Sequence, residues 1–256
     1  MVSSGPAPGR ADLILRRALL LAAILGVVAC GSASAGAIEL SSGEVKAKFD
    51  ARFSPARLSP SEWAPLSPWV SMSFKNPEGT ETPALKEFKI EEDRHLRLNL
   101  KGAPVCSHGT VDEPPITQRC RKALIGRGEM DTYIFYSEGV PIVANTEVTV
   151  YNAGLRNGVR TLFLATFITI PTPKQIVTKV EVKHSILGRY GLKLVGSIPT
   201  VAGGAGSVIS LAWRFHKDVF SAICPLDQHL DTRFTSTLLD GTTLGGTVVR
   251  DCAPAP

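Results

Sequence analysis

The sequence predicts an all-β protein, with an antiparallel β-sandwich or jelly-roll-like fold of about ten to twelve strands. Three observations support this fold class. Short stretches in which apolar and polar residues alternate recur along the chain, which is typical of half-buried strands. Glycine and proline separate these stretches. After residue 36, no stretch keeps a helical apolar period, so we expect little helix outside the N-terminal segment.

The first strand is expected at residues 38–53, where apolar side chains alternate with lysines and an aspartate. Residues 54–68 are rich in proline and predict irregular surface structure, so residues 36–67 form a partly irregular N-terminal segment. Trp63 and Trp69 lie in or beside this stretch. We expect both tryptophans to cover one end of the core, and binding of a sugar or a peptide is the alternative.

Further strands are expected along the rest of the chain. The charged segment Glu91-Glu92-Asp93-Arg94 is interpreted as a solvated hairpin turn between two of them, and acid/base chemistry or a cation site at its three acids is the alternative. Asp240-Gly241 is a strong hairpin-turn dipeptide near the C-terminus. A single helical turn is expected around residues 117–122. The expected strands are 69–74, 85–90, 96–100, 124–135, 147–151, 161–170, 176–184, 192–198, 208–215, 229–238 and 243–250.

The N-terminus predicts a signal peptide over residues 1–35. Arg16-Arg17 precedes an unbroken apolar run from Ala18 to Cys30, and small residues follow. The run is too short to span a bilayer comfortably. Residues 36–256 are then a single exported β-rich domain.

Two processing sites remain open. Cleavage after Ala33-Ser34-Ala35 would release a soluble, secreted protein. Alternatively, Val27-Val28-Ala29-Cys30 is similar to a bacterial lipoprotein signal, in which Cys30 is lipidated and becomes the first residue. We therefore expect a protein that is extracellular or lipid-anchored at the outer face of the cytoplasmic membrane.

The charge of the chain argues against nucleic-acid binding. The formal net charge is +5, and residues 36–256 hold 25 basic and 22 acidic residues. No run of lysine and arginine reaches the length of a nucleic-acid patch. Contact with a membrane is expected only through the lipid anchor.

The five cysteines predict disulfides, because an exported chain meets an oxidising compartment. Cys30 is either removed or lipidated, which leaves four. Of the three pairings that four cysteines allow, we favour Cys106–Cys120 and Cys224–Cys252, because each closes a short loop or hairpin. Each bridge would stabilise the fold by about 3 kcal/mol. The closely spaced cysteine pairs of a zinc site are missing from the sequence.

Several spacings resemble a group of uncharacterised secreted proteins of actinobacteria. The resemblance covers residues 85–252 and rests on Cys120-Arg-Lys-Ala-x-x-Gly126-x-Gly128, Gly191-Leu-Lys-Leu, Ile198-Pro199, Gly203-Gly204, Asp240-Gly241-Thr242 and the two last cysteines. The acid-glycine step usual in that group is Asp227-Gln228 here. The resemblance implies an exported β-rich domain with two cysteine pairs, and it implies no activity.

A basic cluster is the candidate anion-binding site. Arg119, Arg121, Lys122 and Arg127 form the most concentrated positive charge after the signal peptide, and an ordinary solvated turn is the alternative. The neighbouring glycines at 126 and 128 are expected to relieve crowding or to form a bulge at the start of a strand.

Asp227, His229 and Asp231 are the candidate metal ligands. They lie two residues apart, so on a strand they share one face, where carboxylate and imidazole groups could hold a divalent cation. We expect a solvated strand face there instead, with no metal and no cofactor.

No catalytic residue is assigned, since the sequence has no Gly-x-Ser-x-Gly motif. We expect a non-enzymatic binding or structural module whose partner is an envelope polymer, a glycan or another surface protein. A secreted hydrolase that acts on glycan or ester substrates through Asp227 and Asp231 is the alternative.

Overall fold

The structure, a computed structural model, describes residues 36–78, 81–107, 120–135, 141–169, 173–185, 188–199 and 206–254. The chain divides into two units, Met1–Ala33 and Ser34–Pro256, and every described residue belongs to the second unit. The expected signal peptide, with Cys30, lies outside the described residues. In the part of the chain that is described, no helix has the length and apolar character needed to cross a membrane.

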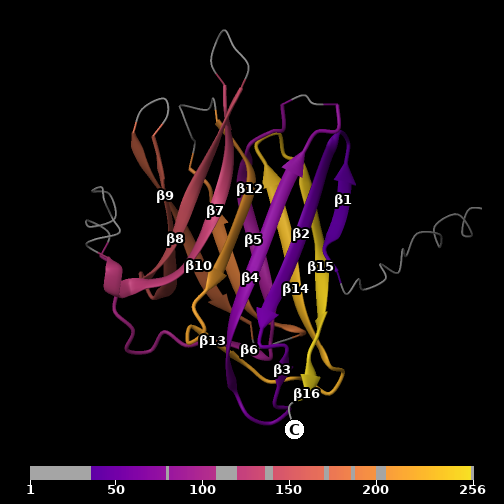
Figure 1. The fold of residues 1–256 in the computed structure, drawn as a ribbon, viewed down its shortest axis with the longest axis vertical. Coiled ribbons are helices and arrows are strands. Elements are labelled where there is room, and N and C mark those ends of the chain that lie inside the picture. Colours follow the sequence, from indigo (N-terminus) through magenta and orange to yellow (C-terminus); the bar gives the residue numbers. More distant parts are fainter. Residues whose placement is uncertain are drawn as a thin grey trace, which may run out of the picture. The chain divides into compact units, whose positions relative to one another are not determined.

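The described residues form an all-β structure, which confirms the fold class expected from the sequence (Figure 1). They contain sixteen strands and one short 3-10 helix, η1 (Arg121–Ala123). The strands are β1 (Ile38–Ser42), β2 (Val45–Ser54), β3 (Arg57–Leu58), β4 (Ala64–Lys75), β5 (Leu85–Asp93), β6 (Leu96–Leu98), β7 (Leu124–Ile134), β8 (Ile142–Arg156), β9 (Val159–Ile168), β10 (Lys174–His184), β11 (Tyr190–Ser197), β12 (Gly206–Phe215), β13 (Phe220–Ala222), β14 (His229–Leu238), β15 (Thr243–Asp251) and β16 (Ala253–Pro254).

Fourteen of the described strands form one continuous sheet. The hydrogen-bonded order is β1-β2-β4-β12-β7-β8-β9-β10-β11-β5-β14-β15, with β13 joined to β4 and β6 joined to β13. Every pair in this sheet is antiparallel, whereas β3 and β16 form a separate parallel pair. The two layers of the expected sandwich are therefore two halves of one sheet that curls over on itself.

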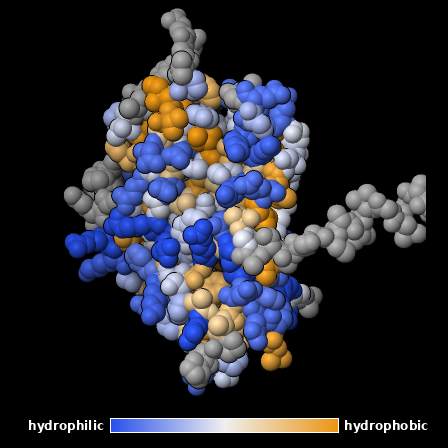
Figure 2. All heavy atoms as spheres, turned by 45° about the vertical axis from the view of Figure 1, so that its right-hand side comes forward, coloured by the Kyte–Doolittle hydropathy of each residue, from blue (hydrophilic) through white to orange (hydrophobic). Residues whose placement is uncertain are grey.

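The apolar core lies between these two halves. In Figure 1, β2, β4, β12, β7 and β8 lie in front of β10, β5 and β14. Side chains from the two halves meet inside: Phe49 of β2 stacks on Phe234 of β14 with ring centroids 5.2 Å apart. Phe88 of β5 packs against Trp213 of β12 at 5.6 Å. Each strand alternates because one face joins this core and the other faces out. The face drawn in Figure 2 is mostly hydrophilic, and hydrophobic residues gather towards its upper end.

The first and last strands of the sheet, β1 and β15, meet at a seam that has no hydrogen-bonded ladder. Ile38 of β1 packs on Gly246 of β15, where an added Cβ atom would lie 2.5 Å from Ile38 Cδ1. Beyond the end of β1, Arg250 of β15 donates a hydrogen bond from Nε to the carbonyl oxygen of Ala51. The guanidinium of Arg250 also pairs with the carboxylate of Asp50. Apolar packing and a partly buried ion pair therefore close the sheet.

Residues 38–53, expected as a single strand, form the β1–β2 hairpin instead. Gly43 sits in its turn with φ +58°, a conformation that glycine adopts without steric cost. The sequence pattern indicates this turn, because apolar residues occupy even-numbered positions at Ile38 and Leu40 and odd-numbered positions from Val45.

The irregular segment expected at residues 54–68 is shorter in the structure, because β4 begins at Ala64. Pro68 lies inside β4 without disrupting it. The strand pairs with β13 up to Leu66 and with β12 from Trp69, so Pro68 falls in the gap between these two ladders. On the edge of β4 that faces β12 and β13, the N–H group that proline lacks therefore costs no ladder hydrogen bond.

Two glycines of β7 allow a close approach to β12, as expected from the sequence. An added Cβ atom at Gly128 would lie 1.9 Å from the carbonyl oxygen of Ala212 and 2.7 Å from Cβ of Trp213. At Gly126 it would lie 2.7 Å from the backbone of the facing strand, and β7 shifts register against β8 just before this residue. The glycines serve the packing of Trp213, which is 1% exposed.

We expect Gly128→Ala to destabilise the protein by about 3 kcal/mol, because the new methyl group must displace backbone. Gly43→Asn is the control: no atom lies within 4 Å of its added Cβ, and asparagine tolerates a positive φ. Urea unfolding followed by tryptophan fluorescence measures both variants. Equal stability of the two variants would show that β7 and β12 can separate without cost.

Candidate functional site

Four neighbouring strands place a tryptophan and three arginines in one row on the outer face of the sheet. Cross-strand pairing aligns Arg52 of β2 with Trp69 of β4, Trp69 with Arg214 of β12, and Arg214 with Arg127 of β7. Their neighbours along the strands, such as Trp213, point into the core, so these four side chains point outward. Adjacent strands are about 4.8 Å apart, so this arginine–tryptophan row spans about 14 Å.

The two outer arginines of the row are held by carboxylates, and the central one is not. Arg52 Nη2 lies 2.8 Å from Asp50 Oδ2. Arg127 pairs with Glu147. Within the described residues, the exposed Arg214 has no ion-pair partner. The row therefore presents one uncompensated guanidinium between two that are fixed in position.

A hollow of about 590 Å³ opens over β4, β12 and β7, and we call it the outer groove. The guanidinium carbon of Arg52 lies 5.0 Å from the ring centroid of Trp69. Aromatic, cationic, carboxylate and imidazole groups all face this groove, so it offers both stacking and hydrogen bonds. Its lining residues are Ser67, Trp69, Arg127, Gly128, Glu129, Ala212, Arg214, Phe215 and His216.

Both expected disulfides are formed. Cys224–Cys252 joins the main core, and Cys106–Cys120 packs on the outer face of the sheet. There it covers Tyr151 of β8 and Phe163 of β9 in a second apolar cluster. Burial raises the pKa of Tyr151, and the side chain of Thr149 and the nearby charge of Arg127 oppose this rise. The Cys106–Cys120 bridge therefore stabilises the sheet beside the Arg127 end of the row.

The described members of the expected basic cluster lie on two successive elements, η1 and β7. Arg121 and Lys122 are exposed on η1, which overlaps the end of the expected helical turn. Arg127 lies on β7 and belongs to the row. Arg119 lies outside the described residues, with the rest of residues 108–119.

The expected metal candidates Asp227 and Asp231 converge on an arginine. Arg189 Nε lies 2.6 Å from Asp93 Oδ2 and 3.1 Å from Asp231 Oδ2, although neither contact is aligned as a hydrogen bond. Arg189 also pairs with Asp227, and its Nη2 donates to the carbonyl oxygen of His229 at 2.7 Å. Among the described residues, no group of three or more histidine, cysteine, aspartate or glutamate side chains could hold a metal ion. We call Arg189, Asp93, Asp227, Asp231 and the backbone of His229 the Arg189 cluster.

The two candidate carboxylates of this cluster have pKa values shifted in opposite directions. Burial raises the pKa of Asp227, but the hydrogen bonds from Arg189 and from the N–H of His229 outweigh it and lower the pKa. Burial raises the pKa of Asp231, and here Arg189 does not overcome it. The ring of His229 contacts Asp251 instead, with Nδ1 2.9 Å from Oδ1. Asp227 and Asp231 thus stabilise the positive charge of Arg189.

Of the segment Glu91–Arg94, expected as a solvated turn, the three acids form the end of β5, so the expectation was wrong for them. The turn follows at Arg94 and His95. Glu92 is 5% exposed and accepts a hydrogen bond from Thr232 Oγ1 at 2.7 Å. Burial, opposed by this hydrogen bond and assisted by Asp93, raises the pKa of Glu92 to about 7. Its partners come from distant strands, so the sequence pattern does not reveal this site.

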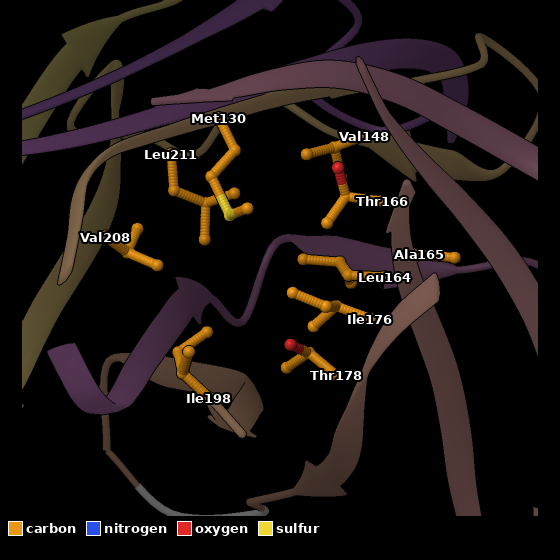
Figure 3. Close-up of a pocket in the computed structure, with 10 residues that line it drawn as sticks. All are labelled: Met130, Val148, Leu164, Ala165, Thr166, Ile176, Thr178, Ile198, Val208 and Leu211. Carbon is orange, nitrogen blue, oxygen red and sulfur yellow. The ribbon is translucent and has the colours of Figure 1, made fainter. Parts of the chain in front are cut away.

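A small cavity lies within the core (Figure 3). Met130, Leu211 and Val208 line one side, and residues of β8, β9 and β10 line the other. Thr166 Oγ1, which is buried without a hydrogen-bond partner, belongs to a residue of this lining. The volume of about 10 Å³ holds about one water molecule. The cavity is therefore too small for an organic ligand.

The chain matches no model of a known protein family, and a search of the curated proteins finds no match. The resemblance to secreted actinobacterial proteins stays a prediction.

The buried Glu92 predicts a specific pH dependence of stability. Its folded-state pKa of about 7 lies above the unfolded value of 4.5, so the fold favours the protonated form. This contribution is complete below pH 4.5, and it is lost as the pH rises to about 7. Glu92→Gln, which keeps an acceptor for Thr232, should therefore stabilise the protein at pH 8 by up to about 3 kcal/mol and change little at pH 4.

Urea unfolding at the two pH values measures this difference. The control is Glu91→Gln on the same strand. It removes an ion pair in which Arg233 Nη2 lies 2.6 Å from Glu91 Oε2, so it should not stabilise the protein at pH 8. A Glu92→Gln effect of the same size at pH 4 and pH 8 would exclude a titrating carboxyl.

Proposed function

We propose that this chain is an exported, non-enzymatic binding protein of the cell envelope or extracellular space, and that its outer groove binds an acidic glycan. Two disulfides support an oxidising location outside the cytoplasm. Both processing routes of the N-terminus fit this proposal: a soluble protein that starts after residue 35, and a protein anchored by lipid at Cys30.

The single observation that carries the proposal is the arginine–tryptophan row. An indole provides a large apolar surface with a polar edge, which suits the apolar face of a sugar ring. Guanidinium groups bind carboxylate and phosphate groups in a bidentate manner. The row spans about 14 Å on the open face of the sheet, so it can contact several units of an extended polymer.

The charges of the row fit an acidic ligand better than a neutral one. Asp50 and Glu147 fix Arg52 and Arg127, and a guanidinium that donates to one carboxylate keeps further N–H donors. Arg214 lies between Trp69 and Arg127, and among the described residues no carboxylate forms an ion pair with it. An acidic glycan would supply the missing negative charge next to the aromatic ring.

The Arg189 cluster supports binding over hydrolysis. A glycosidase uses two carboxyl groups that flank the scissile bond. Asp227 and Asp231 instead contact one arginine, which also contacts Asp93. Arg189 bridges Asp227 and Asp231, so a scissile bond could lie between the two carboxylates only if this guanidinium moved.

We expect Arg214→Gln to weaken binding to polygalacturonate about tenfold, the loss of one charge-assisted contact. Trp69→Ala should weaken it by a similar factor, and neutral dextran should bind neither wild type nor variants. Arg57→Gln, which removes an exposed arginine of β3, is the matched control and should bind as the wild type does. Electrophoresis through gels that contain the polymer measures the affinities.

Urea unfolding checks that each variant is folded. Retention of Arg214→Gln and Arg57→Gln to the same extent would show that only the net charge matters, and it would overturn the outer groove as the site. Release of shortened polymer during the assay would favour the hydrolase.

A further inference from the structure

A second groove lies at the end of the sheet where the chain turns from β5 into β6. It has a volume of about 620 Å³, and we call it the end groove. Its polar lining includes Arg94, Arg97, Asn99 and His184, which are all exposed, and leucines line it further. No acidic residue is among the described residues that line it. None of the three cationic or imidazole side chains has an ion-pair partner in the described part of the chain.

Arg97 is held in place by an aromatic ring. Its guanidinium carbon lies 3.5 Å from the ring centroid of the half-buried Trp63. Stacking covers one face of the guanidinium and leaves its edge, which carries the N–H donors, available to a ligand. Trp63 therefore presents Arg97 to the groove at little entropic cost.

Arg94 is held by the Arg189 cluster. Its N–H donates to the carbonyl oxygen of Arg189 at 2.9 Å. The preceding residue, Asp93, is 0% exposed, accepts from the backbone N–H of His95 at 2.9 Å and pairs with Arg189. An added Cβ at Gly191 would lie 2.8 Å from Cα of Arg94. The start of β11 therefore packs directly on the turn between β5 and β6. The buried ion cluster thus fixes the turn that presents an exposed arginine.

The donors reach the end groove from two sides. Arg97 and Asn99 come from β6 and the residue after it, whereas His184 comes from the end of β10. Tetrahedral phosphate accepts hydrogen bonds in several directions, and arginine is the preferred partner of its oxygens. The leucine part of the lining leaves room for an apolar portion of the same ligand.

We propose that the end groove binds a phosphate group, and that Arg94 and Arg97 are its principal ligands. The proposal concerns a different surface from the outer groove and does not depend on the glycan. The phosphate can belong to a small soluble molecule or to a lipid headgroup, and the chemistry at the arginines is the same.

Two binding measurements test the proposal with the full exported domain, residues 36–256. Calorimetric titration with inorganic phosphate examines the soluble source, and co-sedimentation with phosphatidylglycerol vesicles examines the lipid source. We expect the double variant Arg94→Gln/Arg97→Gln to bind at least tenfold more weakly in one or both measurements. The single variants Arg57→Gln and Arg214→Gln should bind as the wild type does.

The outcomes separate the two proposals for this protein. The double variant should keep its retention on polygalacturonate, because the outer groove is intact. Loss of phosphate binding alone assigns a soluble ligand, and loss of vesicle binding alone assigns a lipid headgroup. If wild type and double variant behave alike in both measurements, or if neither probe binds, the end groove is no phosphate site.

Discussion

A sheet of this length hides its apolar face only when its first and last strands meet, so the fold depends on the seam between β1 and β15. Asp50 is the residue that links this seam to the outer surface. Its buried carboxylate contacts Arg250, which closes the seam, and Arg52, which begins the arginine–tryptophan row. A buried carboxylate that lost one of these partners would leave uncompensated charge. The geometry of the proposed binding surface therefore rests on the closure of the core.

The Arg189 cluster shows how one guanidinium can satisfy three converging carboxylates. Burial would lower the pKa of Arg189, and its hydrogen bond with Asp227 and the charges of Asp93 and Asp231 reverse this and raise it. The arginine is thus kept charged, and the carboxylates are kept close together. Because the backbone of Arg189 also binds the turn at Arg94, a cluster that resembles a catalytic site in sequence acts as a support for a neighbouring surface.

The sequence predicted local features well and long-range ones poorly. Strand β14 has the bounds expected from its alternation, because it ends just before the Asp240-Gly241 turn, and both local cysteine pairings are confirmed. The arginine–tryptophan row could not be predicted, since it depends on the register of β2 and β4 with β12 and β7, which come from distant parts of the chain. Glu92 was misassigned for a related reason: alternation does not show that a strand continues through charged residues when the partners that bury them are distant.

The seam has a further consequence for the order of folding. Arg250 and Ala51 meet across 199 residues of chain, whereas the disulfides join cysteines 14 and 28 residues apart. Contacts of short sequence separation form early, and long-range closure is slow. On the proposed export route the N-terminus would leave the membrane first, so β1 and β2 would be outside long before β15 arrives. The apolar side of the first hairpin would then stay open to solvent until β15 closes the seam, and it would offer a binding surface to a chaperone outside the membrane.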